Sequence, residues 1–175
     1  MTQAQNEAER IRSYLITQAN KLSLPDLVAK VRVDTAPLKD AAHLIPPERF
    51  AERPAENGWS AAEVWTHIVQ VNEHGASAIE GILDTGRTPQ DVRDVLSGDV
   101  HTGFTSGEQY YEAYIQRRER LLLRVLQARG DEHLDVKIHH PLFGDLSWRE
   151  FLLFMRVHDL DHLRQLQAIA RALGC

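Results

Sequence analysis

Nine histidines and a single cysteine, Cys175, dominate the metal-binding potential of this sequence. One cysteine cannot supply a zinc site with two or more thiolates from one chain, so a metal site here must be built mainly from imidazoles. His158 and His162 are four residues apart, which places both side chains on one side of a helix, one turn apart. Two imidazoles at this spacing can bind the same divalent cation. The spacing therefore predicts a metal site centred on this pair.

A third ligand must come from another helix, and His67 is the best-placed candidate. It follows Val64 by three residues and precedes Val71 by four, so it lies on or beside the inner face of its helix. His74 lies near the same inner side and is a reserve ligand or a pocket residue. A single inward histidine is more often a core residue with a hydrogen-bonded neighbour. Three histidines that can share one cation favour metal binding over that alternative.

Polar residues one turn from these histidines can support them. Glu63 precedes the first histidine by one turn and can orient its ring, although its S-x-x-E spacing favours a helix-capping role. Gln165 follows His162 by three residues and can hydrogen-bond a ligand or a bound water, or else make a polar contact between helices. Asp159 and Asp161 flank the histidine pair but should point elsewhere, at about 100° per residue.

Helices must position these residues, and capping boxes predict where three helices begin. The boxes are Ser60–Glu63, Thr105–Glu108 and Ser147–Glu150. We expect these helices to end near Leu83, Ala128 and Gly174. A fourth helix is predicted over Leu24–Ile45 from its apolar stripe, with a kink or break at Pro37. A shorter helix is expected before it, over Glu7–Lys21. The chain is therefore predicted to be all-α, with four long helices and an extra short N-terminal helix.

Two irregular connections join the long helices. The segment Asp84–Phe104 is long for a helix–helix loop, and such a crossover allows consecutive helices to lie parallel. The alternating run Leu134–Ile138 predicts a strand of a short ribbon. His139 and His140 follow that run, and they are expected to border the site because this segment leads into the last helix.

Composition excludes several functional classes. The chain has 175 residues, 43% of them hydrophobic, which corresponds to about one domain with a full core. Its net charge of −5 makes phosphate neutralisation, and hence nucleic-acid binding, a poor expectation. No apolar run approaches the roughly 20 residues of a membrane span, and no signal peptide is evident. A cytoplasmic protein is the expectation.

The sequence resembles the DinB/YfiT-like superfamily of metalloenzymes. The resemblance rests on two motifs about 90 residues apart, which are Trp59-Ser60-x-x-Glu63-x-x-x-His67 and His158-x-x-x-His162-x-x-Gln165. It covers Leu24–Leu173 and includes the segment Pro141–Ser147, which leads into the last helix. It implies a four-helix bundle in up-down-down-up order and a three-histidine metal site formed by His67, His158 and His162. Residues 1–23 would be an N-terminal helical extension, and residues 24–175 the bundle domain.

The resemblance also implies a range of functions. Three imidazoles leave a divalent metal (Zn, Ni, Fe or Mn) with open positions, which is typical of catalytic sites. The family includes enzymes of the thiol S-transferase type, which act on a small molecule with a low-molecular-weight thiol as cosubstrate. The alternatives are a non-catalytic metal- or ligand-binding bundle and a metal-dependent hydrolase. A homodimer is expected from the resemblance alone.

Other families fit less well. A zincin-type protease needs H-E-x-x-H, whereas the segment between His158 and His162 lacks the glutamate. Ferritin-like bundles need paired Glu-x-x-His elements, which we do not find on the inner faces. A basic cluster, formed by Arg117, Arg118, Arg120 and Arg124, is expected to be solvated and paired with Glu112 and Glu119, and an anionic thiol is its alternative partner. Trp59, Trp65 and Trp148 are expected to be packing or interface residues.

Overall fold

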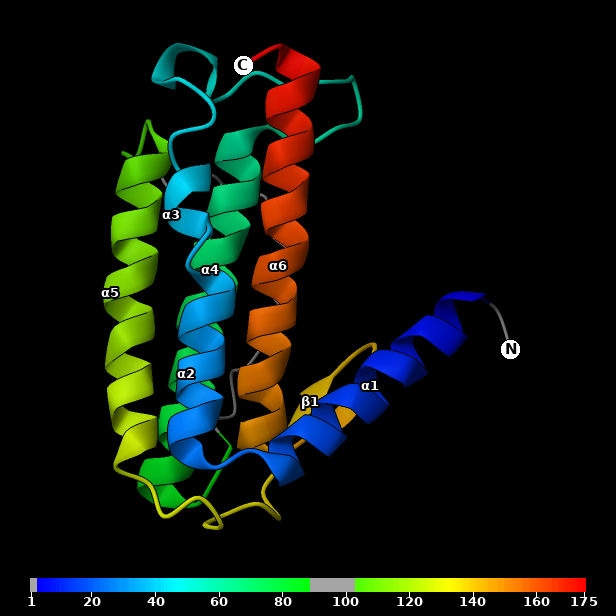
Figure 1. Ribbon diagram of the computed structural model, residues 1–175, viewed down its shortest axis with the longest axis vertical. Helices are drawn as coiled ribbons and strands as arrows, with labels where there is room; N and C mark the ends of the chain where they lie inside the picture. The colour runs from blue at the N-terminus through cyan, green and yellow to red at the C-terminus, as the bar shows by residue number, and fades with distance from the viewer. Residues whose placement is uncertain (1–2, 89–102) are drawn as a thin grey trace.

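Four long helices form an up-down-down-up bundle (Figure 1). The computed structural model describes residues 3–88 and 103–175. Helices α2 and α6 run in one direction, and α4 and α5 run parallel to each other in the opposite direction. In chain order the elements are α1 (Gln3–Lys21), α2 (Leu24–Thr35), α3 (Leu38–Ala41), the 3-10 turn η1 (Pro47–Arg49), α4 (Ala61–Thr85), α5 (Gly107–Leu126), β1 (Ile138–His140), β2 (Gly144–Leu146) and α6 (Trp148–Leu173). The predicted all-α bundle is confirmed. Most of the predicted crossover Asp84–Phe104 lies outside the described residues.

Capping boxes begin α4 and α6, as predicted. The Ser60 amide donates to Glu63 at 2.8 Å, and the Ser60 hydroxyl accepts from the Glu63 amide. The same reciprocal pair of bonds joins Ser147 and Glu150. These contacts satisfy amide groups that the first turn of a helix leaves without a helical partner.

The capping box predicted for the third helix is wrong. Helix α5 begins at Gly107, and its N-cap, Ser106, makes no side-chain capping bond. Instead, the Thr105 amide donates to the side-chain oxygen of Gln109 at 2.7 Å. A tertiary contact fixes this end, because a Cβ on Gly107 would lie only 2.3 Å from the carbonyl oxygen of Ala42. The chain therefore enters α5 along the backbone of an earlier helix, which local spacing cannot show.

The N-terminal region follows the prediction in outline and departs from it in extent. The long helix predicted over Leu24–Ile45 is interrupted near Pro37, where α2 ends and α3 begins. Helix α1 has 19 residues, so it is not short, and its N-terminal part points away from the bundle (Figure 1).

The ribbon before α6 is shifted from its predicted position. The strand predicted at Leu134–Ile138 is wrong, since β1 begins at Ile138 and pairs antiparallel with β2. Leu134 and Val136 are partly buried against the core without forming a strand. Their alternation therefore reflects packing of an irregular segment.

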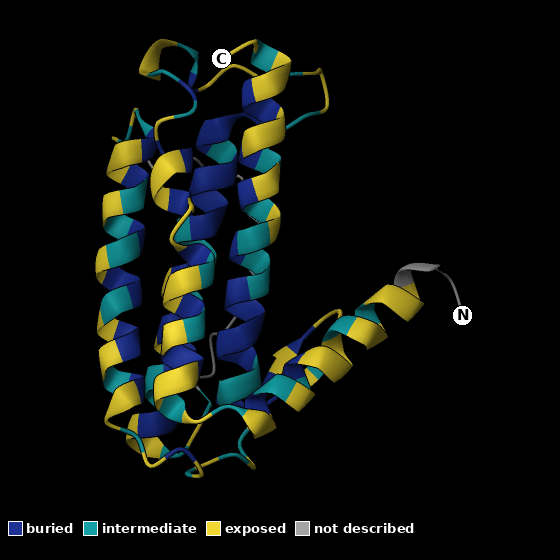
Figure 2. Cartoon of the chain, viewed as in Figure 1, coloured by how far each residue is buried: buried dark blue, intermediate teal, exposed yellow. Residues whose placement is uncertain are grey.

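A buried polar layer divides the bundle core. Figure 2 shows buried residues along the inner faces of the helices. They form two apolar clusters, one around Trp148 and Met155 and one around Trp65 and Leu166. The two tryptophans pack in the core, as expected. Between the clusters along α4, α5 and α6 lie the buried side chains of Asn72, Tyr114, Arg118 and Asp159.

Direct hydrogen bonds join the members of this layer. Arg118 donates to Asp159 at 2.8 Å and to Asn72 at 2.7 Å. The Tyr114 hydroxyl donates to the same Asp159 oxygen at 2.8 Å, and burial raises the pKa of this phenol. A buried charge needs such partners, so an ion pair joins α5 to α6 and a hydrogen bond from the same arginine joins α5 to α4.

The prediction that the four arginines of α5 are solvated is therefore wrong for two of them. Arg118 is buried in the polar layer, and Arg117 is buried in ion pairs with Glu73 and Glu80 of α4. Arg124 pairs with Asp84. None of the described ion pairs joins this cluster to the predicted glutamates of α5. The bonding partners lie across a helix interface, where a sequence pattern on one helix gives no information.

Candidate metal centre

Three histidines from two helices converge beside the polar layer. His67 of α4 and His158 and His162 of α6 each offer a ring nitrogen within 4.8 Å of the others. The Nε2 atoms of His67 and His158 are 2.9 Å apart, and the ring centroids lie 4.3–4.9 Å apart. Nitrogens bound tetrahedrally to zinc at about 2.05 Å lie roughly 3.3 Å from one another. The predicted ligands are thus brought together at a spacing compatible with one metal ion.

The depth of the site differs from the sequence interpretation. His67 is buried, with 7% of its surface exposed, whereas His158 and His162 are only half-buried. The α6 pair was predicted to lie on the core stripe, with Asp159 pointing away from it. Instead, Asp159 takes the deeper position in the core, and the two imidazoles lie at its edge. From this edge position His158 lines a neighbouring cavity, together with His67.

The environment of His67 and His162 favours the neutral form of these two imidazoles. Burial, and then the proximity of His158 and His162, lowers the pKa of His67 to about 4. Burial and His158 also lower the pKa of His162. A neutral imidazole retains a lone pair, which is the form that binds a metal ion.

Hydrogen bonding directs the lone pair of His162 toward the centre. Its Nδ1 lies 2.7 Å from the Gln165 carboxamide oxygen, which can only accept, so Nδ1 carries the proton and Nε2 is free to bind. The predicted role of Gln165 beside a ligand therefore has a geometric basis. The buried Nδ1 atoms of His67 and His158 have no hydrogen-bond partner among the described residues. Nδ1 of His158 is 3.8 Å from the nearer Asp159 oxygen.

Trp59 contacts the centre in a way the sequence interpretation did not foresee. Its indole ring is parallel to the His162 ring, at an interplanar angle of 1° and a centroid distance of 6.4 Å. It also meets His67 edge-on, with centroids 5.4 Å apart. Its place in the same motif as His67, directly before the helix-capping Ser60, was the available signal. The tryptophan restricts the movement of two of the three imidazoles.

The other predicted site residues lie farther from the triad. Glu63 completes the capping box and pairs with Arg53 rather than with a histidine. His74 faces a separate groove between α4 and α5, and its Nδ1 lies 2.8 Å from the Gln70 carbonyl oxygen. His139 is exposed and pairs with Asp145.

His140 does lie beside the triad, as part of a cavity wall. Its Nδ1 accepts from the amides of Leu142 and Phe143 at 3.1 and 3.3 Å, which closes the β1–β2 turn. Its ring packs against Phe143 and Phe154. His140 thus shapes the hairpin that borders the centre.

A cavity of about 580 Å³ opens onto the triad. We call it the histidine cavity. His67, His158 and His140 contribute to its wall, and the other lining residues are Glu7, Ile11, Val71, Pro141, Leu142, Phe143, Phe154, Val157, Asp161 and Arg164. Its volume falls within the range of small-molecule sites, and its wall is mostly apolar with few polar groups.

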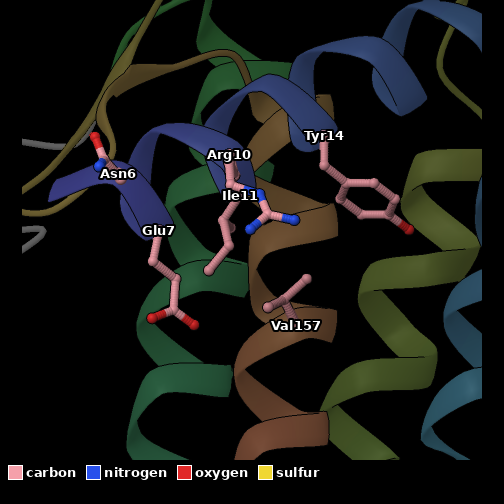
Figure 3. A pocket seen from close by; sticks show the side chains of 6 residues that line it. All are labelled: Asn6, Glu7, Arg10, Ile11, Tyr14 and Val157. Atoms are coloured by element: carbon pink, nitrogen blue, oxygen red, sulfur yellow. The ribbon is translucent and has the colours of Figure 1, made fainter. Parts of the chain in front are cut away.

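A second hollow adjoins the histidine cavity along α1. Figure 3 shows the side chains that line this groove, among them Ile11 of α1 and Val157 of α6. Glu7, Ile11 and Val157 line both hollows. The groove and the histidine cavity therefore meet at these three side chains.

The fold and the triad together define a class of four-helix bundles with an imidazole centre between the second and fourth long helices. A family model described as the DinB superfamily matches residues 32–166, and the chain belongs to this superfamily. Its members typically bind metal, which agrees with the three-histidine cluster. No curated protein matched the sequence. None of the described helices is long and apolar enough to cross a membrane.

Proposed function

We propose that this protein is a metal-dependent enzyme of the thiol S-transferase type, acting on a small molecule with a low-molecular-weight thiol as cosubstrate. One observation carries the proposal: three imidazoles converge, and two of them, His67 and His158, line a cavity whose wall is mostly apolar. Such a donor set suits Zn, Ni, Fe or Mn and leaves coordination positions free. When bound, the divalent cation would supply a Lewis acid that favours the thiolate form of a coordinated thiol.

The residues of the chain have separate roles in this proposal. His67, His158 and His162 hold the ion, and Gln165 keeps His162 in the binding tautomer. The apolar wall of the histidine cavity excludes water and orients the electrophile. Cys175 is exposed beyond the C-terminal end of α6, so the nucleophilic thiol must arrive as a cosubstrate.

Metal content is the first test. The chain, purified without a histidine tag, is expected to contain about one divalent cation per protein by elemental analysis. Variants His67→Ala, His158→Ala and His162→Ala should each lose it. His43→Ala is the matched control because this histidine is exposed and lies outside the cluster. Unchanged metal content in all three variants would refute the metal site.

Catalysis is tested separately with monochlorobimane as the electrophile and cysteine or glutathione as the thiol. In this reaction an S–C bond forms, the C–Cl bond breaks, chloride leaves and the thiol proton passes to solvent. We expect metal-dependent product formation that the three histidine variants abolish. A metal-loaded chain that conjugates none of a broad panel of thiols and electrophiles would support the non-catalytic binding protein instead. Metal-dependent cleavage of esters or amides would support the hydrolase.

A further inference from the structure

Helix α1 contributes to the histidine cavity although the whole helix precedes the matched family domain. The family match begins at residue 32, whereas Glu7 and Ile11 line the cavity. The helix is held in place by hydrogen bonds to two other elements. Arg12 donates to the Phe143 carbonyl oxygen of the hairpin at 2.8 Å, and Arg149 of α6 donates to the Ala19 carbonyl oxygen at 3.0 Å. The wall that α1 adds is therefore attached at the middle of the helix and near its C-terminal end.

The interior of the cavity favours an apolar ligand body. Ile11, Val157 and Phe154 present hydrocarbon surface near the histidines. Leu142, at the tip of the hairpin, lines the same cavity and is 71% exposed. When a ligand covers a large apolar side chain that is this exposed, the removal of its surface from water contributes favourable binding free energy.

Charged groups lie at the open side of the cavity. Glu7, Asp161 and Arg164 are exposed and line it, with two carboxylates against one guanidinium. A ligand tail that carries a negative charge would meet a net negative rim. Electrostatics therefore favours a neutral tail over an anionic one.

We infer that α1 and the β1–β2 hairpin form the specificity wall for a small molecule with a metal-binding head and a neutral apolar body. This inference rests on the proposed function, since the head would bind at the three-histidine centre. The body lies against Ile11, Val157 and Leu142, with Glu7 facing the end of the tail. Specificity for the body is thus set in part by α1 residues, Glu7 and Ile11, which precede the matched family domain.

The test uses hydroxamates, which bind divalent metals, with the metal-loaded full chain. Acetohydroxamate reports on the centre alone, and octanohydroxamate adds an alkyl chain of six further carbons. Because each buried methylene strengthens binding about three- to fourfold, octanohydroxamate should bind at least 100-fold more tightly by calorimetry. An equal affinity for the two hydroxamates would overturn the inference while leaving the metal centre in place. Failure of both to bind would instead contradict the proposed function.

Substitutions of single lining residues test which side chains form the specificity wall. Leu142→Ser and Ile11→Ser should each weaken octanohydroxamate binding about tenfold and leave acetohydroxamate binding within twofold. Val33→Ser is the matched control, because this α2 valine is 70% exposed and lies outside the cavity lining. If the control weakens octanohydroxamate as much as Leu142→Ser does, the wall is misplaced and the inference fails.

Glu7→Gln provides a gain of binding that a structural role would not produce. It should strengthen binding of suberic monohydroxamate, whose tail ends in a carboxylate, by two- to fivefold and leave octanohydroxamate unchanged. No gain would refute the role of Glu7.

A metal-free readout keeps the inference testable even if metal loading fails. Titration of the metal-free chain with 1-octanol should shift the methyl NMR signals of Ile11 and Val157. Unshifted signals would overturn the inference.

Discussion

The buried ion pair between Arg118 and Asp159 permits a sharp stability prediction. The two side chains are 1% and 2% exposed, and one Asp159 oxygen accepts from both Arg118 and the Tyr114 hydroxyl at 2.8 Å. Asp159→Asn keeps the shape of the side chain and removes its charge, which leaves the guanidinium buried without a counterion. Breaking a buried pair in this way costs about 3–5 kcal/mol. Since domains of this size unfold with roughly 5–15 kcal/mol, the variant should be close to unfolding.

An exposed pair that joins α2 to α5 provides the control. Arg32 of α2 and Glu119 of α5 are 2.6 Å apart, but their side chains are 41% and 37% exposed. Solvent screens this pair, so Glu119→Gln should cost less than about 1 kcal/mol. Urea unfolding at pH 7, followed by circular dichroism, measures both losses on one scale. Equal losses for Asp159→Asn and Glu119→Gln would refute the assignment of the cost to burial.

A second variant distinguishes two causes of the stability loss in Asp159→Asn, namely the unpaired Arg118 guanidinium and general damage to core packing. Arg118→Met removes the cation, so combining it with Asp159→Asn leaves no uncompensated charge in the layer. The double variant should be more stable than Asp159→Asn alone by at least 1 kcal/mol. If the two losses simply add, the stranded guanidinium is not the cause of the instability.

Three further predictions follow from other residues. The folded pKa of His67, about 4, lies below its unfolded value near 6.5, so the unfolded chain binds the proton first. The metal-free protein should therefore lose about 3 kcal/mol from this group as the pH falls from above 6.5 to 4, and urea unfolding should show a shallower pH slope for His67→Asn. Gly107→Ala should cost about 1–3 kcal/mol in urea unfolding, because its Cβ would overlap the Ala42 carbonyl oxygen, and an unchanged midpoint would contradict the contact. Gln165→Leu should weaken metal affinity 10- to 100-fold in competition with a chelator, since His162 would lose the partner that sets its tautomer.

The parts of the fold predicted correctly are those fixed by contacts within one turn. Ser60 and Ser147 begin their helices because a capping box is a contact between residues three apart. The start of α5 depends instead on the close approach of Gly107 to Ala42, 65 residues away in sequence, and the predicted box there failed. The spacing of residues within one segment predicts only contacts between residues that are close in sequence.

The convergence of the three histidines was predictable from the sequence, but the depth at which each imidazole lies was not. Helical spacing placed His158 and His162 on one side of α6, and the register of His67 between Val64 and Val71 added the third ligand. Periodicity assigns a face to each helix, but it does not give the rotation of one helix against another. For this reason Asp159 was expected to point away, whereas a partner on α5, 41 residues earlier, places it in the core. The stacking of Trp59 beside the triad was hidden for the same reason.

The placement of the histidines on two helices has a consequence for chain entropy. His67 and His158 are separated by 91 residues, and all of α5 and the hairpin lie between them. An ion held by both helices would act as a reversible cross-link that closes this loop. In the chain-entropy treatment used for disulfides, a loop of that length corresponds to about 4–5 kcal/mol of lost freedom in the unfolded chain. A chain whose single cysteine cannot form an internal disulfide would thus have, in its imidazoles, a staple that a chelator can remove.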